Sequence, residues 1–380
     1  MEICKEEMCT GCSACMNICP KKAISMTSNA LGKSIPKIDD NKCISCELCK
    51  RKCPIINKVK KNDVKKVFAA WSKETIDQQL CSSGGIATCF SRFILENKGV
   101  VFGATLENKK PKHISIKNKD ELNKLCGSKY VQSEIGYSYS EVKQYLISGK
   151  KVLFVGTPCQ IAGLKSFLEK DYENLLLIDL ICHGVPPFEY LKEHLDTLCK
   201  GWDNVTFRGK YDFKLTVYKN NQIKKQYNYL DDEYYKAFYE GLIFRDNCYK
   251  CEYACPQRCS DITIGDFWGL DKKSLKNEYD GRISVALINT DKGLEFFYNA
   301  SDMIYYEERN INEPFCEEQT NLIRPSSVHK DRNIFEYYYL KKSFDKAVMK
   351  TSLAKQLRVQ KVKRIFKKNT IIKKIYYYFR

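Results

Sequence analysis

The fold centres on the segments KVLFVG (151–156), PCQIAGLKSFLEK (158–170) and LLLIDLI (175–181). Two short apolar runs flank a helix-like stretch, which is the pattern of a parallel strand–helix–strand unit. Ligands in open α/β sheets bind at the carboxyl ends of such strands. We therefore expect the chemistry of this chain in the turns that follow the two apolar runs.

Similar patterns continue on both sides of this unit. Strand-like runs are VFAAW, GVVFGATL, VTFRG and FKLTVY, and helix-like segments are IATCFSRFILEN and DDEYYKAFYEGLIF (67–71, 99–106, 205–209, 213–218, 86–97 and 231–244). The segment SDITIGDFWG (260–269) adds an alternating, half-buried strand. The body beyond residue 66 is therefore predicted to be a mixed α/β domain.

An internal cysteine repeat precedes this body. CTGCSACMNICP (9–20) and CISCELCKRKCP (43–54) both spell C-x2-C-x2-C-x3-C-P, the run that holds 4Fe-4S clusters in bacterial ferredoxins. Three thiolates of each run reach one cluster, and the fourth crosses to the other. This rule predicts one cluster on Cys9, Cys12, Cys15 and Cys53, and a second on Cys43, Cys46, Cys49 and Cys19.

The alternative for this repeat is a zinc ribbon, which uses separated pairs of ligands and does not require three cysteines in a row. Cys4 lies outside the pattern and has no predicted role. Gly11 permits the loop backbone to bend tightly around sulfur.

A later cysteine group, CYKCEYACPQRC, contains Cys248, Cys251, Cys255 and Cys259. Four thiolates this close fit either a third cluster or a zinc ion. Cys159 and Cys182 each follow a predicted central strand, so the fold brings them together. They either replace Cys255 and Cys259 in the third cluster or pack in the core as small hydrophobes.

The segment SSGG precedes a predicted helix. Its hydroxyls, free backbone N–H groups and missing side chains suit a phosphate or pyrophosphate, although Ser is also a common helix cap. No G-x-G-x-x-G occurs in the chain, which excludes the usual dinucleotide fingerprint.

Six ordered motifs together resemble the coenzyme F-420 hydrogenase/dehydrogenase beta-subunit family, over about residues 1–330. They are SSGG (82–85), GSKYVQS (127–133), GTPCQIAGLK (156–165), DLICHGVPP (179–187), C-x2-C (248–251) and SDITIGDFWG (260–269). The resemblance implies an FAD beside iron–sulfur clusters, with Cys248 and Cys251 as cluster ligands. It also implies flavin contacts from Ser82, Ser83, Gly84, Gly85, Gly127, Ser128, Lys129, Tyr130, Gly156, Thr157 and Pro158.

The chain departs from this family in two places. FRGK (207–210) only approximates the usual Phe-Arg-acid-Lys stretch, and the basic C-terminal tail is not part of the shared domain. The deazaflavin substrate is therefore not implied. His113 and His183 fit structural roles near a metal ligand as well as proton transfer, so no catalytic acid is assigned.

These observations predict four parts and a fold class of α+β or α/β. Residues 1–57 are expected to form the two-cluster 4Fe-4S ferredoxin-type domain, and the lysine-rich 58–66 a linker. The mixed α/β FAD and iron–sulfur domain covers 67–330, and a basic helical tail covers 331–380.

Charge is concentrated in the tail. Residues 341–380 hold 14 Lys and Arg against the single acid Asp345, which is +13 of the formal +18. The body is nearly neutral, so nucleic acid is not an expected partner. The tail fits either a solvated helix or a contact with an anionic membrane surface or acidic partner.

The prediction is a cytoplasmic iron–sulfur flavoprotein oxidoreductase. It would pass electrons between two or three 4Fe-4S clusters and a flavin-coupled hydride carrier, organic substrate or redox partner protein. The start of the chain shows no secretory signal, and cysteines in a reducing compartment serve as metal ligands. The alternatives are a flavin-free electron-transfer subunit and a non-catalytic partner in polysaccharide biosynthesis.

Overall fold

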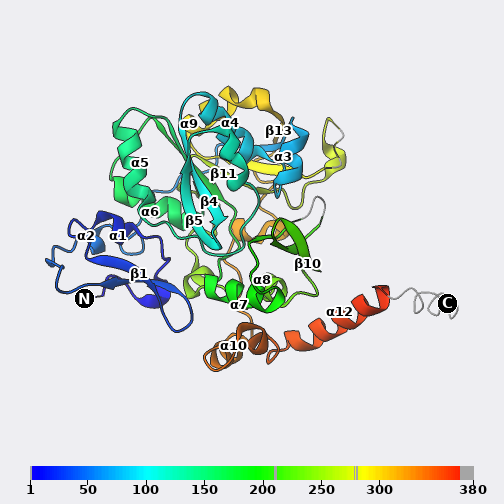
Figure 1. Cartoon of the computed structure of the whole chain (residues 1–380). Coiled ribbons are helices and arrows are strands. Elements are labelled where there is room, and N and C mark those ends of the chain that lie inside the picture. Colours follow the sequence, from blue (N-terminus) through cyan, green and yellow to red (C-terminus); the bar gives the residue numbers. More distant parts are fainter. Residues whose placement is uncertain (1, 209–211, 278, 280, 369–380) are drawn as a thin grey trace.

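A mixed eight-stranded sheet forms the centre of the computed structural model, which describes residues 2–208, 212–277, 279 and 281–368 (Figure 1). In order across the sheet, the strands are β13 (Ile304–Arg309), β3 (Lys66–Ser72), β12 (Ser284–Ile288), β11 (Ile262–Asp266), β7 (Leu175–Leu180), β6 (Val152–Gly156), β4 (Val100–Glu107) and β5 (Lys110–Ile116). The four strands β11, β7, β6 and β4 are parallel, and the outer pairs are antiparallel.

The predicted strand–helix–strand unit is confirmed. Helix α6 (Pro158–Leu168) connects β6 to β7, and Phe154 lies opposite Leu177 in their parallel register. The apolar runs are continuous because these strands are buried on both faces. Leu153 belongs to the core on one face, whereas Val152 and Phe154 belong to the core on the other.

Helices cover both faces of the sheet. Buried residues of α4 (Ile86–Glu96) and α9 (Asp291–Asn299) pack on one face, including Phe90 and Phe297. On the opposite face, α5 (Ser138–Ile147) and α6 pack over β4, β6 and β7. Helix α3 (Thr75–Leu80) follows β3 at one end of the sheet. The α/β expectation for the body is met by this layered arrangement.

The cysteine repeat folds as a separate small unit. It contains α1 (Ala14–Ile18), β1 (Ile24–Ser28), β2 (Ser34–Ile38) and α2 (Leu48–Arg51), with β1 and β2 antiparallel. Across the described part of the chain, short 3-10 helices lie at Glu6–Met8, Lys119–Lys124, Asp246–Lys250, Lys272–Ser274, Ser301–Met303 and Glu317–Leu322. Helix α1 contacts α6, so the small unit packs directly on the central strand–helix–strand unit.

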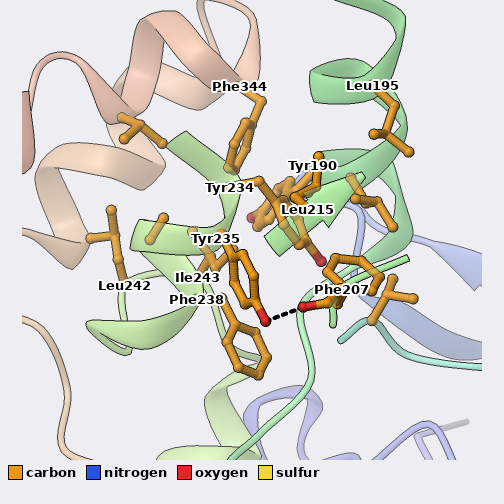
Figure 2. Packing of buried hydrophobic residues seen from close by; sticks show 14 of the residues in the cluster. Tyr190, Leu195, Phe207, Leu215, Tyr234, Tyr235, Phe238, Leu242, Ile243 and Phe344 are labelled. Atoms are coloured by element: carbon orange, nitrogen blue, oxygen red, sulfur yellow. Dashed lines mark hydrogen bonds between the residues drawn. The ribbon is translucent and has the colours of Figure 1, made fainter. Parts of the chain in front are cut away.

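An aromatic core lies under the sheet domain. It is built by α7 (Phe188–Leu198), the sheet of β8 (Asn204–Thr206), β9 (Lys214–Lys219) and β10 (Gln222–Asn228), and α8 (Glu233–Tyr239). Figure 2 shows Tyr235 donating its hydroxyl hydrogen to the carbonyl oxygen of Phe207. The predicted helix 231–244 is wrong beyond Tyr239, because Gly241 takes a φ of +64° and turns the chain away.

The first part of the C-terminal tail belongs to this aromatic core. Helices α10 (Arg332–Tyr339) and α11 (Phe344–Val348) and the start of α12 (Leu353–Lys368) bury Phe335, Phe344, Val348, Leu353 and Leu357. The interpretation of residues 341–357 as a solvated extension is therefore wrong. Further along α12, Lys361 pairs with Glu233, and Arg364 donates to the carbonyl oxygen of Gln226 at 2.8 Å. This helix leads toward the C-terminus (Figure 1), and residues 369–380 lie outside the described part of the chain.

The linker also has structural contacts. Asn62 pairs its backbone with Arg258, and Val59 packs against the core of α5 and α6. Residues 58–66 therefore lie along the body. Within the described ranges, every helix is too short or too polar to cross a lipid bilayer.

A buried charged triad attaches the tail to the aromatic core. His194 of α7 is fully buried, and its ring nitrogens lie 2.9 Å from Asp232 Oδ2 and 2.6 Å from Asp345 Oδ1. Burial alone lowers the pKa of His194, but the two carboxylates outweigh it and raise the pKa to about 10. His194 is therefore a cation at neutral pH.

Replacing His194 tests this attachment. His194→Gln leaves two buried carboxylates without a cation, so we expect a loss of about 3–5 kcal/mol in unfolding free energy at pH 6.5. A pKa raised on folding stabilises below the unfolded value near 6.5 and loses that effect as pH rises toward 10. The deficit, measured by far-UV circular dichroism, should thus shrink at alkaline pH. Lys192→Ala on the same helix removes only an exposed pair and serves as the control.

Candidate functional site

Two hollows in the cysteine-repeat unit are each lined by four of its repeat thiols. One hollow of about 330 Å³ is bordered by Cys9, Cys12, Cys15 and Cys53. The other, of about 360 Å³, is bordered by Cys19, Cys43, Cys46 and Cys49. The fold thus gathers the repeat cysteines into the two sets that the crossover rule predicts. Within the described residues, no group of acidic, His or Cys side chains converges tightly enough for a single metal ion.

The first hollow is closed on one side by a glycine and an unassigned cysteine. Gly11 has a φ of +66°, and a Cβ there would lie 2.5 Å from Gln132 Nε2. Only glycine fits this close approach. Cys4 also lines the hollow, beside Cys9 and Cys53. Cys4 precedes the repeat, and its isolated place in the sequence did not indicate that the chain would fold back to place it at this hollow.

A third set of thiols gathers at the ends of the central strands. Burial raises the pKa of Cys182, and the nearby Cys248, Cys159 and Cys251 raise it further. The pKa of Cys159 is likewise raised to about 12 by burial and then by Cys251 and Cys248. These four side chains come from α6, the turn after β7 and the turn Asp246–Lys250 with its following residue.

The other two cysteines of the C-terminal group have separate hydrogen-bond partners, although after burial Cys255 also raises the pKa of Cys251 and Cys159 raises that of Cys259. The Cys255 thiol hydrogen-bonds the carbonyl oxygens of Glu252 and Gln257 at 3.3 Å, and Lys61 Nζ lies 3.4 Å from its sulfur. Cys259 is buried with its sulfur 3.5 Å from the carbonyl oxygen of Pro158. Of the two pairs left open by the sequence, Cys159 and Cys182 are the pair beside Cys248 and Cys251.

The first and third sets adjoin along helix α6. A Cβ on Gly163 would lie 3.0 Å from both Cβ and Sγ of Cys12, so the first hollow packs against the helix backbone. Cys159 lies one turn earlier on the same helix, and it is close enough to Cys12 to add to the rise in the pKa of Cys12 that burial causes. The helix therefore connects the two sets.

A large cavity opens at the carboxyl ends of the parallel strands. It gathers residues from five of the six sequence motifs, and its wall includes Ser82, Ser83, Gly85, Gly127, Ser128, Lys129, Tyr130, Gly156 and Thr157. Cys159 and Cys182 belong to the same wall. The cavity and the third cysteine set therefore share two side chains.

Two helices begin at this cavity. Gly85 and Ile86 start α4, and Thr157 caps α6 with a reciprocal capping box to Gln160. The amino end of a helix favours anions. Gly84 and Pro158 are not part of the wall; a Cβ on Gly84 would lie 2.6 Å from the carbonyl oxygen of Ala70, so close packing on β3 requires this glycine.

Charged side chains belong to the cavity wall, among them Lys129, which the family resemblance implied, and Arg208 and Asp266, which it did not. Arg208, in the FRGK stretch, donates to Asp266 Oδ2 at 2.7 Å and to the Tyr130 hydroxyl at 2.7 Å. Burial lowers the pKa of Lys129 to about 8, and its Nζ donates to the carbonyl oxygens of Leu125 and Cys126. The wall thus carries positive charge held in fixed positions.

The two histidines at the cavity are neutral. Burial lowers the pKa of His113 to about 4, and its ring nitrogens lie 3.1 Å from the Val155 carbonyl oxygen and the Ser133 hydroxyl. Burial also lowers the pKa of His183. His113 is thus held in place by two hydrogen bonds within the wall.

Arg245 joins the cysteine-repeat unit to the cavity wall. Its guanidinium donates to the carbonyl oxygens of Cys9 and Ser34 at 2.8 and 2.9 Å, and to Gln132 Oε1 at 2.8 Å. Its position three residues before Cys248 is a weak sequence signal, because nothing local indicates which carbonyls a buried arginine will meet.

The fold and the cysteine sets define an iron–sulfur protein of the electron-transfer, oxidoreductase-like class. Residues 8–56 match the 4Fe-4S dicluster domain, and residues 149–314 match the family formed by the C-terminal part of the coenzyme F420 hydrogenase/dehydrogenase beta subunit. These two matches confirm the resemblance of the chain's motifs.

Curated relatives match parts of this chain. One protein of the F(420)H(2) dehydrogenase of Methanosarcina mazei is 24% identical over 48% of this chain and 55% of its own length. The coenzyme F420-dependent sulfite reductase of Methanocaldococcus jannaschii is 28% identical over 50% of this chain and 30% of its own length. The chain thus spans about half or less of these relatives.

Two further likenesses concern smaller shares or structure alone. An uncharacterized polyferredoxin-like protein of Methanocaldococcus jannaschii is 42% identical over 14% of this chain and 36% of its own length. The F420-reducing NiFe hydrogenase complex from Methanosarcina barkeri contains a chain that aligns with 75% of this one and 90% of itself, at 18% identity and a TM-score of 0.45.

Serine variants test which thiols form the third set. If Cys159, Cys182, Cys248 and Cys251 hold a 4Fe-4S cluster, Cys182→Ser and Cys248→Ser should each reduce about 12 iron atoms per chain to about 8. Cys255→Ser, from the same segment, should retain the full amount. Iron and acid-labile sulfide are measured on anaerobically prepared protein. An unchanged iron content in both Cys182→Ser and Cys248→Ser would exclude the assignment.

Proposed function

We propose that this chain is an iron–sulfur flavoprotein that passes electrons between its clusters and a flavin bound in the large cavity. The observation that carries this proposal is that Cys159 and Cys182 belong to the third cysteine set and also line the cavity. A group in the cavity would therefore lie beside a cluster held by that set. The electron donor or acceptor is a redox partner protein, a hydride carrier or an organic substrate.

The proposed electron route follows the packing of the three cysteine sets. The second hollow shares its unit with the first, and the first adjoins the third through Cys12, Gly163 and Cys159. The third then borders the cavity. The three cysteine sets and the cavity therefore follow one another along α1 and α6. These two helices are already in contact, so the path requires no movement of the two units.

The cavity residues suit a flavin with a pyrophosphate. The amino ends of α4 and α6 supply oriented backbone N–H groups, and the hydroxyls of Ser82, Ser83 and Thr157 add further donors. Apolar and aromatic wall residues, among them Leu122, Leu125, Phe238 and Trp268, suit a flat ring.

A bound flavin supplies hydride chemistry on one side and single-electron transfer on the other. The residues of this chain bind and orient it: the Thr157 cap holds the start of α6 in place, and the Arg208–Asp266 pair fixes the opposite wall. Tyr130 is held between them by its hydroxyl contact with Arg208. The wall excludes water through its aromatic side chains.

Thr157 provides the sharpest test of the flavin site. Thr157→Asp keeps a good helix cap but places a negative charge at the proposed pyrophosphate, so we expect binding to weaken by about 3 kcal/mol, more than a hundredfold. Thr157→Asn keeps the cap without the charge and should retain FAD. Flavin per chain is measured by absorbance after anaerobic purification and titration with FAD.

Thr157 Oγ1 lies 3.2 Å from Cys159 Sγ, so a substitution at Thr157 is next to a proposed cluster ligand. Iron analysis of the same samples therefore separates loss of flavin from loss of a cluster. Reduced ferredoxin or a hydride donor, a deazaflavin among them, should bleach the flavin band of the unmodified chain. Protein with full clusters that takes up neither FAD nor FMN would replace this proposal with a flavin-free electron-transfer subunit.

A further inference from the structure

Two cysteines outside all three sets meet in the wall of the cavity. Cys81 and Cys126 are half-buried, and both border the cavity. Thr88 Oγ1 lies 3.0 Å from Cys81 Sγ and 3.6 Å from Cys126 Sγ, so one hydroxyl contacts both sulfurs. The pair lies 45 positions apart in the chain and is brought together by the fold.

The loops that carry these cysteines are fastened to each other. The backbone N–H of Ser128 donates to Ser82 Oγ at 2.6 Å, one or two residues beyond each cysteine. Arg208 and Arg282 both donate to the carbonyl oxygen of Ser82, at 3.1 and 3.0 Å. Gly127, with a φ of +78°, makes the turn that directs Cys126 toward Cys81. The two sulfurs are therefore held next to each other.

The charges around the pair make its two members unequal. The interaction with the Cys81 thiol, together with Thr88 and Lys129, lowers the pKa of Cys126 to about 6 against the opposing effects of burial and Asp77. The same interaction, together with burial, raises the pKa of Cys81. Cys126 is thus the more readily ionised of the two thiols, and a thiolate is the nucleophile in disulfide exchange.

We propose that Cys81 and Cys126 form a reversible dithiol–disulfide couple that reacts with small disulfides entering the cavity. This site goes beyond the proposed function and needs neither flavin nor cluster. Neither Cys81 nor Cys126 is a proposed cluster ligand, so both thiols are available for disulfide exchange. The couple would add a two-electron acceptor to the wall of the cavity.

The reaction has two balanced steps. The Cys126 thiolate attacks one sulfur of a small disulfide, forms a mixed disulfide and releases one thiolate, which takes up a proton. Cys81 then loses its proton, attacks the Cys126 sulfur and releases the second thiol. The thiolate–thiol pair of the protein has lost two electrons and one proton, and the small disulfide has become two thiols, with the second proton taken from solvent.

Peptide mapping of the full chain tests this directly. Anaerobic protein is incubated with oxidised glutathione, alkylated and digested with trypsin without reduction. We expect a new species linking residues 125–129 to residues 74–92, with its yield rising with the ratio of oxidised to reduced glutathione and lost again with dithiothreitol. The iron content of the same sample should not change.

Residues 74–92 also contain Cys89, which provides the matched control. Cys89→Ala should keep the linked species, whereas Cys81→Ser should abolish it, and fragment ions assign the bond if either variant folds poorly. Thr88→Val should slow its formation near neutral pH several-fold. Glutathione adducts on separate peptides, or no link at any ratio, would overturn the proposal, while flavin retention measured alongside reports independently on the proposed function.

Discussion

The buried guanidinium of Arg245 holds together the parts of this molecule that carry its chemistry. Arg245 is 2% exposed, and a buried charge is costly unless it is fully hydrogen-bonded. Its planar group provides five donors in a fixed fork, which lysine does not. Those donors reach the Cys9 loop, the strand β2 and the Gln132 segment at once. The cysteine-repeat unit thereby takes one fixed position on the body.

The backbone around Arg245 extends this effect to the third cysteine set. Its N–H donates to the carbonyl oxygen of Val185, and its own carbonyl accepts from the N–H of Cys248. A second buried arginine acts similarly: Arg258 donates to Asp179 Oδ1 at 2.9 Å and to the carbonyl oxygen of Tyr253. Both cations lie near thiols: burial raises the pKa of Cys251 and of Cys248, and this rise is opposed by Arg258 at Cys251 and by Arg245 at Cys248. Each of these thiols thus lies near a fixed positive charge.

The sequence predicted those parts of the fold that are determined by residues near one another in the chain. Strands β6 and β7 are apolar throughout because both faces are buried, and the cysteine repeat has a spacing set by one cubane. The sequence did not predict the packing of residues 341–357, because Phe344, Val348 and Leu353 meet their partners only across the aromatic core. The role of Gly84 likewise depends on its close packing against Ala70 of β3, which no local sequence pattern indicates.

The site itself followed from topology more than from any single motif. The parallel strands β4, β6, β7 and β11 end on the same side, so the turns after them converge. The serine and glycine segments and two of the cysteines lie in these turns or beside them. The sequence left open which cysteines lie next to one another, since Cys248 and Cys255 are three and four residues from Cys251 along the chain. The sheet decides this, because Cys159 and Cys182 follow neighbouring parallel strands whose ends face the cavity.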